Sequence, residues 1–301
     1  MKRPIFMTIP KYLFPFFFVA CVLSASCAES NQVDEASQSF PSPGKLLQRA
    51  YLKNAEKGDA SAQCELGFLY YSGRNGAEKD YEKAREWLTK SAEQDYSEAQ
   101  MLLGSLYHDG IGVNTNSSER FRWLLKAVEK KQTDKSNNLD SNELAMAYRY
   151  LGRDFQIGEG VKKDSDQAFS SFFKAAELGD AEAQVLVGSF YSLGISVKAD
   201  QKESVKWYEK AAKQGDVTGL CALGECYKEG KGVPQNFVEA YKWYSLAVAV
   251  GNVSAYTPIT RETVLPISAL KFRDELAKQM TPEQLADAQK RTEKFWSDMK
   301  K

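Results

Sequence analysis

The sequence predicts an all-α protein in which tandem helix pairs stack into a right-handed α-solenoid. A block made of a small or leucine residue, a glycine, two variable positions and an aromatic residue occurs five times, with its glycines spaced 37, 48, 36 and 36 residues apart. Another glycine stands six residues after the glycine of each block, and an aspartate or asparagine follows it. A fixed period of about 20 to 50 residues is typical of solenoids, because each unit buries its apolar face only against a neighbour.

The first residues have the layout of a secretory signal peptide. Residues 1–28 carry three basic and no acidic residues, then an apolar run from Tyr12 to Leu23, then small residues up to Ala28. This run is shorter than the roughly 20 residues of a membrane-spanning helix. Two routes stay open, cleavage after Ala28 or lipidation of Cys27, whose preceding residues resemble a bacterial lipobox with its leucine one residue early. We expect export to the periplasm, or to the outer membrane if Cys27 is lipidated, with secretion as a further alternative.

The next two segments lead into the repeats. Residues 29–44 are small, polar and interrupted by proline, so they predict a disordered tether. Residues 45–57 predict the second helix of a leading half-repeat.

Each repeat predicts two helices, which we call helix A and helix B. Helix A carries the glycine, which costs about 1 kcal/mol in helix propensity and therefore indicates close packing against helix B. Helix B begins at the aspartate or asparagine, and in four repeats a Glu or Gln three residues later predicts a capping box. An aromatic residue stands seven positions after the cap. The residues three positions after the cap are Glu119, Gln167, Glu203 and Glu239, and the aromatic position holds Trp87, Trp123, Trp207 and Trp243.

The period divides the chain into five repeats over residues 58–252. Residues 130–142 are a polar insertion that predicts a projecting loop, and residues 253–301 predict capping helices, one of them starting at Thr281 with a capping box. Arg120 and Ser204 depart from the small residue expected early in helix B, and Ser171 departs from the tryptophan position. The predicted repeats are residues 58–94, 95–142, 143–178, 179–214 and 215–252.

The blocks Leu66–Tyr70, Leu103–Tyr107 and Leu223–Tyr227, followed by paired glycines, a cap, a tryptophan and an Ala-Ala pair, resemble the Sel-one-like repeat, a relative of the tetratricopeptide repeat. The resemblance covers the five repeats. It implies a protein-interaction surface on the concave face of the solenoid.

Composition excludes several functions. The 301 residues contain 40 basic and 40 acidic residues, so the basic excess typical of nucleic-acid binding is absent. His108 is the single histidine, which excludes a histidine-cluster metal site and leaves one base for a Ser-His or Cys-His mechanism. The paired glycines are followed by no Gly-Lys-Ser/Thr motif, so they indicate helix capping and not phosphate binding. We expect no cofactor and no metal.

The cysteines bear on an alternative function. Cys64 and Cys221 stand in the same position of distant repeats, and Cys221 and Cys226 are five residues apart on one helix, so we interpret all three as buried structural thiols. A cysteine-rich branch of the resembled family is associated with β-lactams through a recurrent cysteine pair that this chain lacks. The alternative is therefore an envelope enzyme or binder acting on cell-wall or β-lactam-type substrates.

Two positions of helix A, directly after the glycine and three residues further on, face the concave surface by analogy with tetratricopeptide grooves. The alternative is an ordinary solvated helix face. Arg149 and Arg153 lie four residues apart and would present two cations to an acidic partner segment. We expect a non-catalytic protein-interaction scaffold of the bacterial cell envelope that binds a partner peptide or domain. The candidate groove residues are Tyr71, His108, Arg149, Arg153, Gln156, Ser192, Glu225 and Lys228, with Phe68, Ser105 and Ser189 at further positions of the same row.

Overall fold

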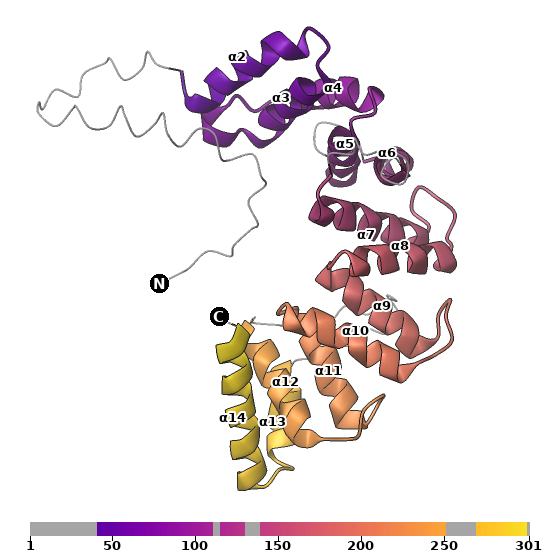
Figure 1. The fold of residues 1–301 in the computed structure, drawn as a ribbon, viewed down its shortest axis with the longest axis vertical. Helices are drawn as coiled ribbons and strands as arrows, with labels where there is room; N and C mark the ends of the chain where they lie inside the picture. Colours follow the sequence, from indigo (N-terminus) through magenta and orange to yellow (C-terminus); the bar gives the residue numbers. More distant parts are fainter. Residues whose placement is uncertain (1–40, 111–114, 130–138, 251–268, 300–301) are drawn as a thin grey trace, which may run out of the picture. The chain divides into compact units, whose positions relative to one another are not determined.

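A computed structural model describes residues 41–110, 115–129, 139–250 and 269–299 of the chain. The predicted leader with Cys27, and residues 29–40 of the predicted tether, lie outside these ranges. Within them the chain forms thirteen α-helices and one short 3-10 helix, without a strand (Figure 1). The predicted all-α class is confirmed. None of the described helices is long and apolar enough to cross a membrane.

The helices follow one another as tandem pairs. The A helices are α3 (Ala60–Ser72), α5 (Ser97–Asp109), α7 (Ser141–Ile157), α9 (Ala181–Leu193) and α11 (Val217–Glu229). The B helices are α4 (Tyr81–Glu93), α6 (Ser117–Glu129), α8 (Ser165–Glu177), α10 (Gln201–Lys213) and α12 (Phe237–Val250). Helix α2 (Pro43–Ala55) precedes them, and α13 (Ala269–Ala277) and α14 (Pro282–Met299) follow. The arrangement is an α-solenoid of helix pairs.

The glycine of each A helix faces a large side chain of its own B helix. A Cβ built on Gly152 would lie 2.6 Å from Phe172 Cδ1, and one on Gly188 would lie 2.6 Å from Tyr208 Cε1. The glycine therefore lets the two helices approach closely, as the sequence predicts. The five pairs are Gly67 with Leu88, Gly104 with Leu124, Gly152 with Phe172, Gly188 with Tyr208 and Gly224 with Tyr244.

The second glycine of each repeat ends helix A. Gly73, Gly110, Gly158, Gly194 and Gly230 are left-handed C-caps with φ between 61° and 77°. Only glycine adopts this conformation without steric cost, which is why the residue recurs. Helix capping, and not phosphate binding, is the structural role of these glycines.

The predicted capping boxes do not form at the N-caps of the B helices. Asp164 and Asp200 accept hydrogen bonds from backbone amides of the following turn, but no box closes over them. The cap amide already donates to the carbonyl of a helix-A aromatic residue, as from Asp200 to Tyr191 (2.9 Å). The residue three positions on therefore has no cap amide to accept from, and Glu203 pairs instead with Lys206. Complete boxes form at Asp140 with Glu143, and at Thr281 with Gln284 as predicted.

Buried glutamines join successive repeats. Gln63, Gln100 and Gln184 stand four residues before the helix-A glycine, and each donates its side-chain amide to a carbonyl of the preceding B helix. The acceptors are Ala55, Ala92 and Ala176 at 3.0, 3.1 and 3.2 Å. Each of these carbonyls also accepts a backbone hydrogen bond from the turn that follows its helix. The glutamine bonds are therefore additional contacts, and they fix each helix pair onto the next.

Two predicted boundaries are wrong. Helix α2 begins at Pro43, because proline suits the first helical position and Gly44 lies in contact with the backbone of Ala77, so residues 43–44 belong to the half-repeat and not to the tether. The predicted loop over residues 130–142 also extends too far: Leu139 is buried and α7 starts at Ser141. Residues 130–138 lie outside the described ranges.

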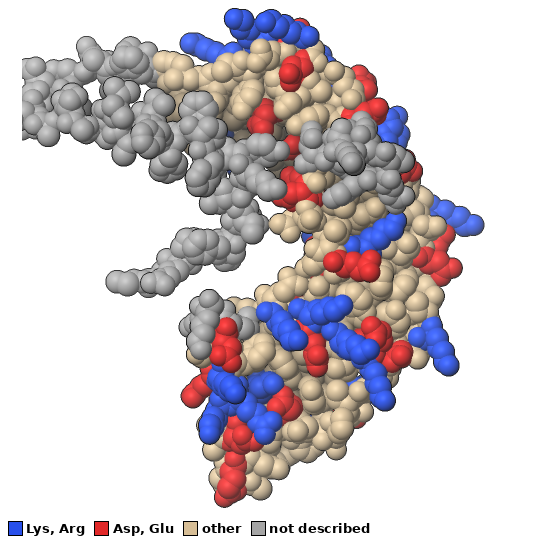
Figure 2. Space-filling view, viewed as in Figure 1, with Lys and Arg blue, Asp and Glu red and all other residues tan. Residues whose placement is uncertain are grey.

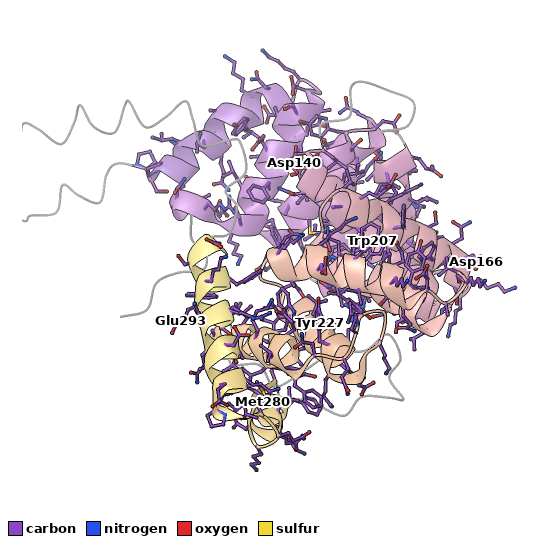
Figure 3. All side chains as sticks on the ribbon, turned by 60° about the horizontal axis from the view of Figure 1, so that its bottom comes forward. Asp140, Asp166, Trp207, Tyr227, Met280 and Glu293 are labelled. Atoms are coloured by element: carbon purple, nitrogen blue, oxygen red, sulfur yellow. The ribbon has the colours of Figure 1, made fainter. Side chains whose placement is uncertain are left out.

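The C-terminal helices cover the last repeat, as predicted, although residues 253–268 lie outside the described ranges. Phe295 of α14 packs edge-on against Trp243, with ring centroids 5.1 Å apart, and Phe272 of α13 packs against Tyr244 at 5.5 Å. Arg291 donates to Glu239 across the same contact (2.7 Å). Figure 3 shows Glu293 on α14 and Met280 near its start, whereas Trp207 lies within the stack of repeats. The two helices therefore cap the apolar end of the solenoid.

Candidate functional site

A polar pocket lies between the second and third repeats. Its walls come from the end of α5, the start of α6 and the second half of α7, and its volume is about 320 Å³. Residues 111–114, which connect α5 to Thr115, lie outside the described ranges. The lining residues are Tyr107, His108, Thr115, Ser117, Arg120, Tyr150, Arg153, Asp154, Ile157 and Glu159.

A buried ion pair forms the floor of this pocket. Arg120 of α6 contacts Asp154 of α7 through both its Nη2 and its Nε, the latter 3.3 Å from Oδ2. Arg120 is 5% exposed and Asp154 is 1% exposed. In the other four repeats the position of Arg120 holds alanine or serine, and the position of Asp154 holds leucine, phenylalanine or cysteine. The two charged residues are thus paired departures from the repeat, one on each of two neighbouring repeats.

Glu159 closes the pocket from the loop after α7. Its carboxylate lies 3.2 Å from Arg120 Nη2 and accepts a hydrogen bond from the Ser117 hydroxyl (3.0 Å). Burial raises the pKa of Glu159, but the hydrogen bonds from Arg120 and Ser117 together outweigh this effect and hold the pKa below its usual value. The Glu159 side chain is 46% exposed. The pocket therefore already binds one carboxylate that is in contact with water.

Asp154 makes stability depend on pH. Burial raises its pKa to about 6, and the opposing effect of Arg120 offsets only part of this shift. An acid whose pKa is raised by folding binds its proton more tightly in the folded state, so its contribution to stability falls as pH rises from about 4 to about 6.

We expect Asp154→Asn to remove this contribution. The test measures the free energy of unfolding of both proteins by denaturant titration from pH 4 to pH 7. The difference between wild type and variant should change by about 1 to 3 kcal/mol across that range. A constant difference would mean that Asp154 does not titrate there.

The structure brings two of the predicted groove residues together in the pocket. His108 and Arg153 are both exposed, and His108 lies against Tyr150, with ring centroids 5.6 Å apart. Gln156 is half-buried on the same helix as Arg153 and is not part of the lining. Tyr71 lies in the first repeat, in a separate aromatic group with Phe68 and Tyr81 at 6.4 and 6.2 Å.

Arg149 does not form the predicted pair of cations with Arg153. Its guanidinium bonds to Asp180 (3.1 Å) and Glu182 (2.6 Å), at the start of α9. These acids raise its pKa against the lowering effect of burial. Sequence spacing places Arg149 one turn from Arg153 but does not show that the next repeat supplies two carboxylates. The cation of Arg149 fastens α7 to α9.

The remaining groove residues do not converge on one site. Ser189 is buried and shares a hydrogen bond with the Tyr208 hydroxyl (3.1 Å), so it is not part of an accessible row. Ser192 donates to Gln201 (3.3 Å). Lys228 lies over the ring of Phe272, 4.4 Å from its centroid, and is thereby partly covered by α13. Glu225 is half-buried on α11, and Ser105 bonds to the carbonyl of Met101 within α5.

Cys64, Cys221 and Cys226 are buried free thiols, as predicted. Burial raises the pKa of Cys221 and Cys226 to about 12 and raises that of Cys64 further. A thiol with so high a pKa is protonated at neutral pH and is a poor nucleophile. Among the described residues, no group of three or more His, Cys, Asp or Glu side chains could hold a metal ion. The described part of the chain thus offers the cysteine-based alternative no activated group.

Sequence reasoning missed Asp154, Glu159, Ser117 and Tyr150. The available signal was a pair of departures from the repeat. Asp154 stands at a helix-A position that is apolar in the other repeats, and Arg120 stands at the small-residue position of the preceding helix B. An acid and a base at such positions of neighbouring repeats indicate an ion pair. Figure 2 shows the wider charge distribution, in which basic and acidic residues are interspersed over the visible face. The polar pocket therefore stands out by its geometry and not by an excess of one charge.

This repeated architecture, with glycine-packed helix pairs and a capped end, defines a helical-repeat solenoid protein. The chain belongs to the Sel1 repeat family: the model of that repeat matches residues 60–96, 97–131, 145–180, 181–216 and 217–252, more than half of the chain.

Solved structures agree with this assignment. A Sel1 repeat protein from Oxalobacter formigenes is 31% identical, with a TM-score of 0.57 over 69% of this chain and 80% of that one. The protein c5321, a protective antigen present in uropathogenic Escherichia coli strains, displays an SLR fold and is 25% identical, with a TM-score of 0.53 over 81% of this chain and 58% of that one.

Two curated relatives are larger proteins. Chitin synthase regulatory factor 3 of Schizosaccharomyces pombe is 32% identical over 137 residues, which are 44% of this chain and 13% of that protein. The ERAD-associated E3 ubiquitin-protein ligase component HRD3A of Arabidopsis thaliana is 36% identical over 58 residues, which are 19% of this chain and 9% of that protein. The matches thus span less than a sixth of these relatives.

Proposed function

We propose that this chain is a non-catalytic protein-interaction scaffold of the bacterial cell envelope, which binds a partner peptide or domain on the side formed by its A helices. The observation that carries the proposal is a contrast between positions. Core positions repeat from unit to unit, whereas Tyr71, His108, Gln156 and Ser192, which occupy one equivalent helix-A position, differ in each. A scaffold of this kind keeps its packing constant and varies its surface.

The names of the curated relatives support the same class. One is a regulatory factor of chitin synthase, and the other is a component of a ubiquitin ligase. Both names describe proteins that act on or with another protein. The buried, protonated thiols of this chain favour a binding function over the alternative of β-lactam or cell-wall chemistry.

The envelope location rests on the predicted leader. Residues 1–28 combine early basic residues, an apolar run and small residues before Ala28, which is the pattern of exported proteins. The intact mass of the protein recovered from cells distinguishes cleavage after Ala28 from a lipid on Cys27. Recovery of the uncleaved chain in the cytoplasmic fraction would contradict export.

We expect a photo-crosslinking amino acid at Gln156 or Ser192 to capture a defined envelope protein. Both residues lie on A helices and are partly exposed. Lys206, which lies on the helix-B side of the fourth repeat and is 66% exposed, is the matched control position. Mass spectrometry of the crosslinked material identifies the partner. Equal capture from Lys206, or turnover of nitrocefin by the pure protein, would contradict a scaffold that binds through its A helices.

A further inference from the structure

We propose that the pocket between the second and third repeats is a carboxylate-binding site in which Glu159 occupies the place of a partner's carboxylate until the partner displaces it. This inference rests on the proposed scaffold function and specifies what the scaffold recognises. The ligand is a peptide that presents either an acidic side chain or a free carboxyl terminus.

The contacts of Glu159 show what the pocket accepts. One carboxylate oxygen lies 3.2 Å from Arg120 Nη2, and the other accepts from the Ser117 hydroxyl at 3.0 Å. A charged donor and a hydroxyl that bind the two oxygens of one carboxylate form a charge-assisted recognition site. The same two donors would serve a carboxylate of equal shape that arrives from another chain.

Glu159 can leave the site, whereas Asp154 cannot. The Glu159 side chain is 46% exposed, so its carboxylate regains most of its hydration when it leaves Arg120. The Asp154 side chain is only 2% exposed and stays paired with Arg120 on the pocket floor. An exchange of one carboxylate for another therefore changes the occupant but leaves the buried pair intact.

Arg153 supplies the cation that attracts the incoming group. It is exposed at the pocket mouth beside His108, and no acidic partner of its guanidinium is seen among the described residues. Arg120, in contrast, contacts both Asp154 and Glu159. A peptide carboxylate that contacts Arg153 and then replaces Glu159 at Arg120 keeps every charge of the pocket paired.

The balance of charge selects a carboxylate over a phosphate. Once Glu159 is displaced, the lining carries two arginines and one acid, so its single surplus positive charge matches a carboxylate and is too small for the roughly two negative charges of a phosphate group. The volume of about 320 Å³ suits a side chain or a chain end and is small for a whole folded surface. The rings of Tyr107 and Tyr150 line the space in which the adjoining peptide would lie.

The test uses a short fluorescent peptide of glycine and serine that ends in glutamate with a free carboxyl terminus. Fluorescence anisotropy measures its affinity for the purified full chain. We expect Arg153→Gln to weaken binding about tenfold, because one charge-assisted contact is lost. Glu159→Gln should strengthen binding about threefold to tenfold, because the competing carboxylate becomes neutral.

The matched control is Arg122→Gln. Arg122 lies on α6 only two residues from Arg120 but outside the pocket, where it pairs with Glu119 and its side chain is 55% exposed. Its replacement should leave affinity unchanged. Circular dichroism and thermal melting show that each surface variant keeps its fold.

Two further peptides identify the source of the carboxylate. Loss of binding on amidation of the terminus assigns the chain end, and loss on exchange of glutamate for glutamine assigns the side chain; either result supports the site. The inference is overturned if no peptide saturates wild type or Glu159→Gln, or if Arg153→Gln and Arg122→Gln weaken binding equally. The crosslinking experiment gives an independent outcome. If a partner captured at Gln156 binds the Arg153→Gln variant as tightly as wild type, the scaffold function is supported and the carboxylate site is contradicted.

Discussion

Asp154→Leu is expected to lower the free energy of unfolding by about 3 to 5 kcal/mol, although leucine is the residue that the first two repeats carry at this position. The loss arises because Arg120, which is 5% exposed, keeps its charge and retains only the partly hydrated Glu159 as a partner. Denaturant unfolding at neutral pH, followed by circular dichroism, measures the effect. Hydrogen exchange should show the loss of protection concentrated in α6 and α7.

The double variant Arg120→Ala with Asp154→Leu separates the buried charge from the packing. It restores the residue types of the other repeats, such as Ala84 and Leu69 in the first. Because a buried ion pair recovers little more than its desolvation cost, the double variant should be within about 1 kcal/mol of wild type or more stable. If it were as unstable as Asp154→Leu alone, an uncompensated charge would not be the cause. Arg122→Ala, which breaks an exposed pair, should cost less than about 1 kcal/mol.

The presence of a buried pair whose expected net effect on stability is so small fits a role in binding. Arg120 holds Glu159 at the pocket mouth and is itself held by Asp154. An alanine and leucine pair would pack in the same place but could not bind a carboxylate.

The sequence predicts the repeats well because their signal is local. Each glycine, cap and tryptophan stands at a fixed distance from the next, and packing between helices of one pair requires that spacing. The C-terminal cap follows from the same kind of signal at Thr281.

The pocket depends on contacts that no local pattern records. Arg120 is visible in the sequence as a departure from a small residue, but its partner lies 34 positions later, across the boundary between two repeats. Arg149 is a similar case, since its two acids belong to the following repeat. The absent capping boxes have the same origin, because a tertiary bond to the helix-A carbonyl occupies the cap amide. Sequence periodicity thus predicts the elements, whereas contacts between elements decide the chemistry.

Gly152→Leu is expected to lower the free energy of unfolding by about 3 kcal/mol, with loss of hydrogen-exchange protection in α7 and α8. Even a single Cβ at this position would lie 2.6 Å from Cδ1 and 2.7 Å from Cε1 of Phe172, which is 1% exposed. Leucine gains about 1 kcal/mol in helix propensity over glycine. The overpacking of a close-packed interface outweighs that gain, because neither helix can move without breaking contacts to the adjacent repeats.

The swap variant Gly152→Leu with Phe172→Ala tests whether the two residues share one space. It moves the large side chain from α8 to α7, so we expect it to recover at least half of the lost stability. Phe172→Ala alone should cost about 3 to 5 kcal/mol through the cavity that it leaves. If the single losses simply added in the swap variant, the glycine would be required for its backbone and not for the approach of helix B. Recovery would show that the recurring glycine sets the distance between the two helices of a repeat. The glycine would thereby also set the position of Arg153 and Asp154, the two residues that follow Gly152 in α7.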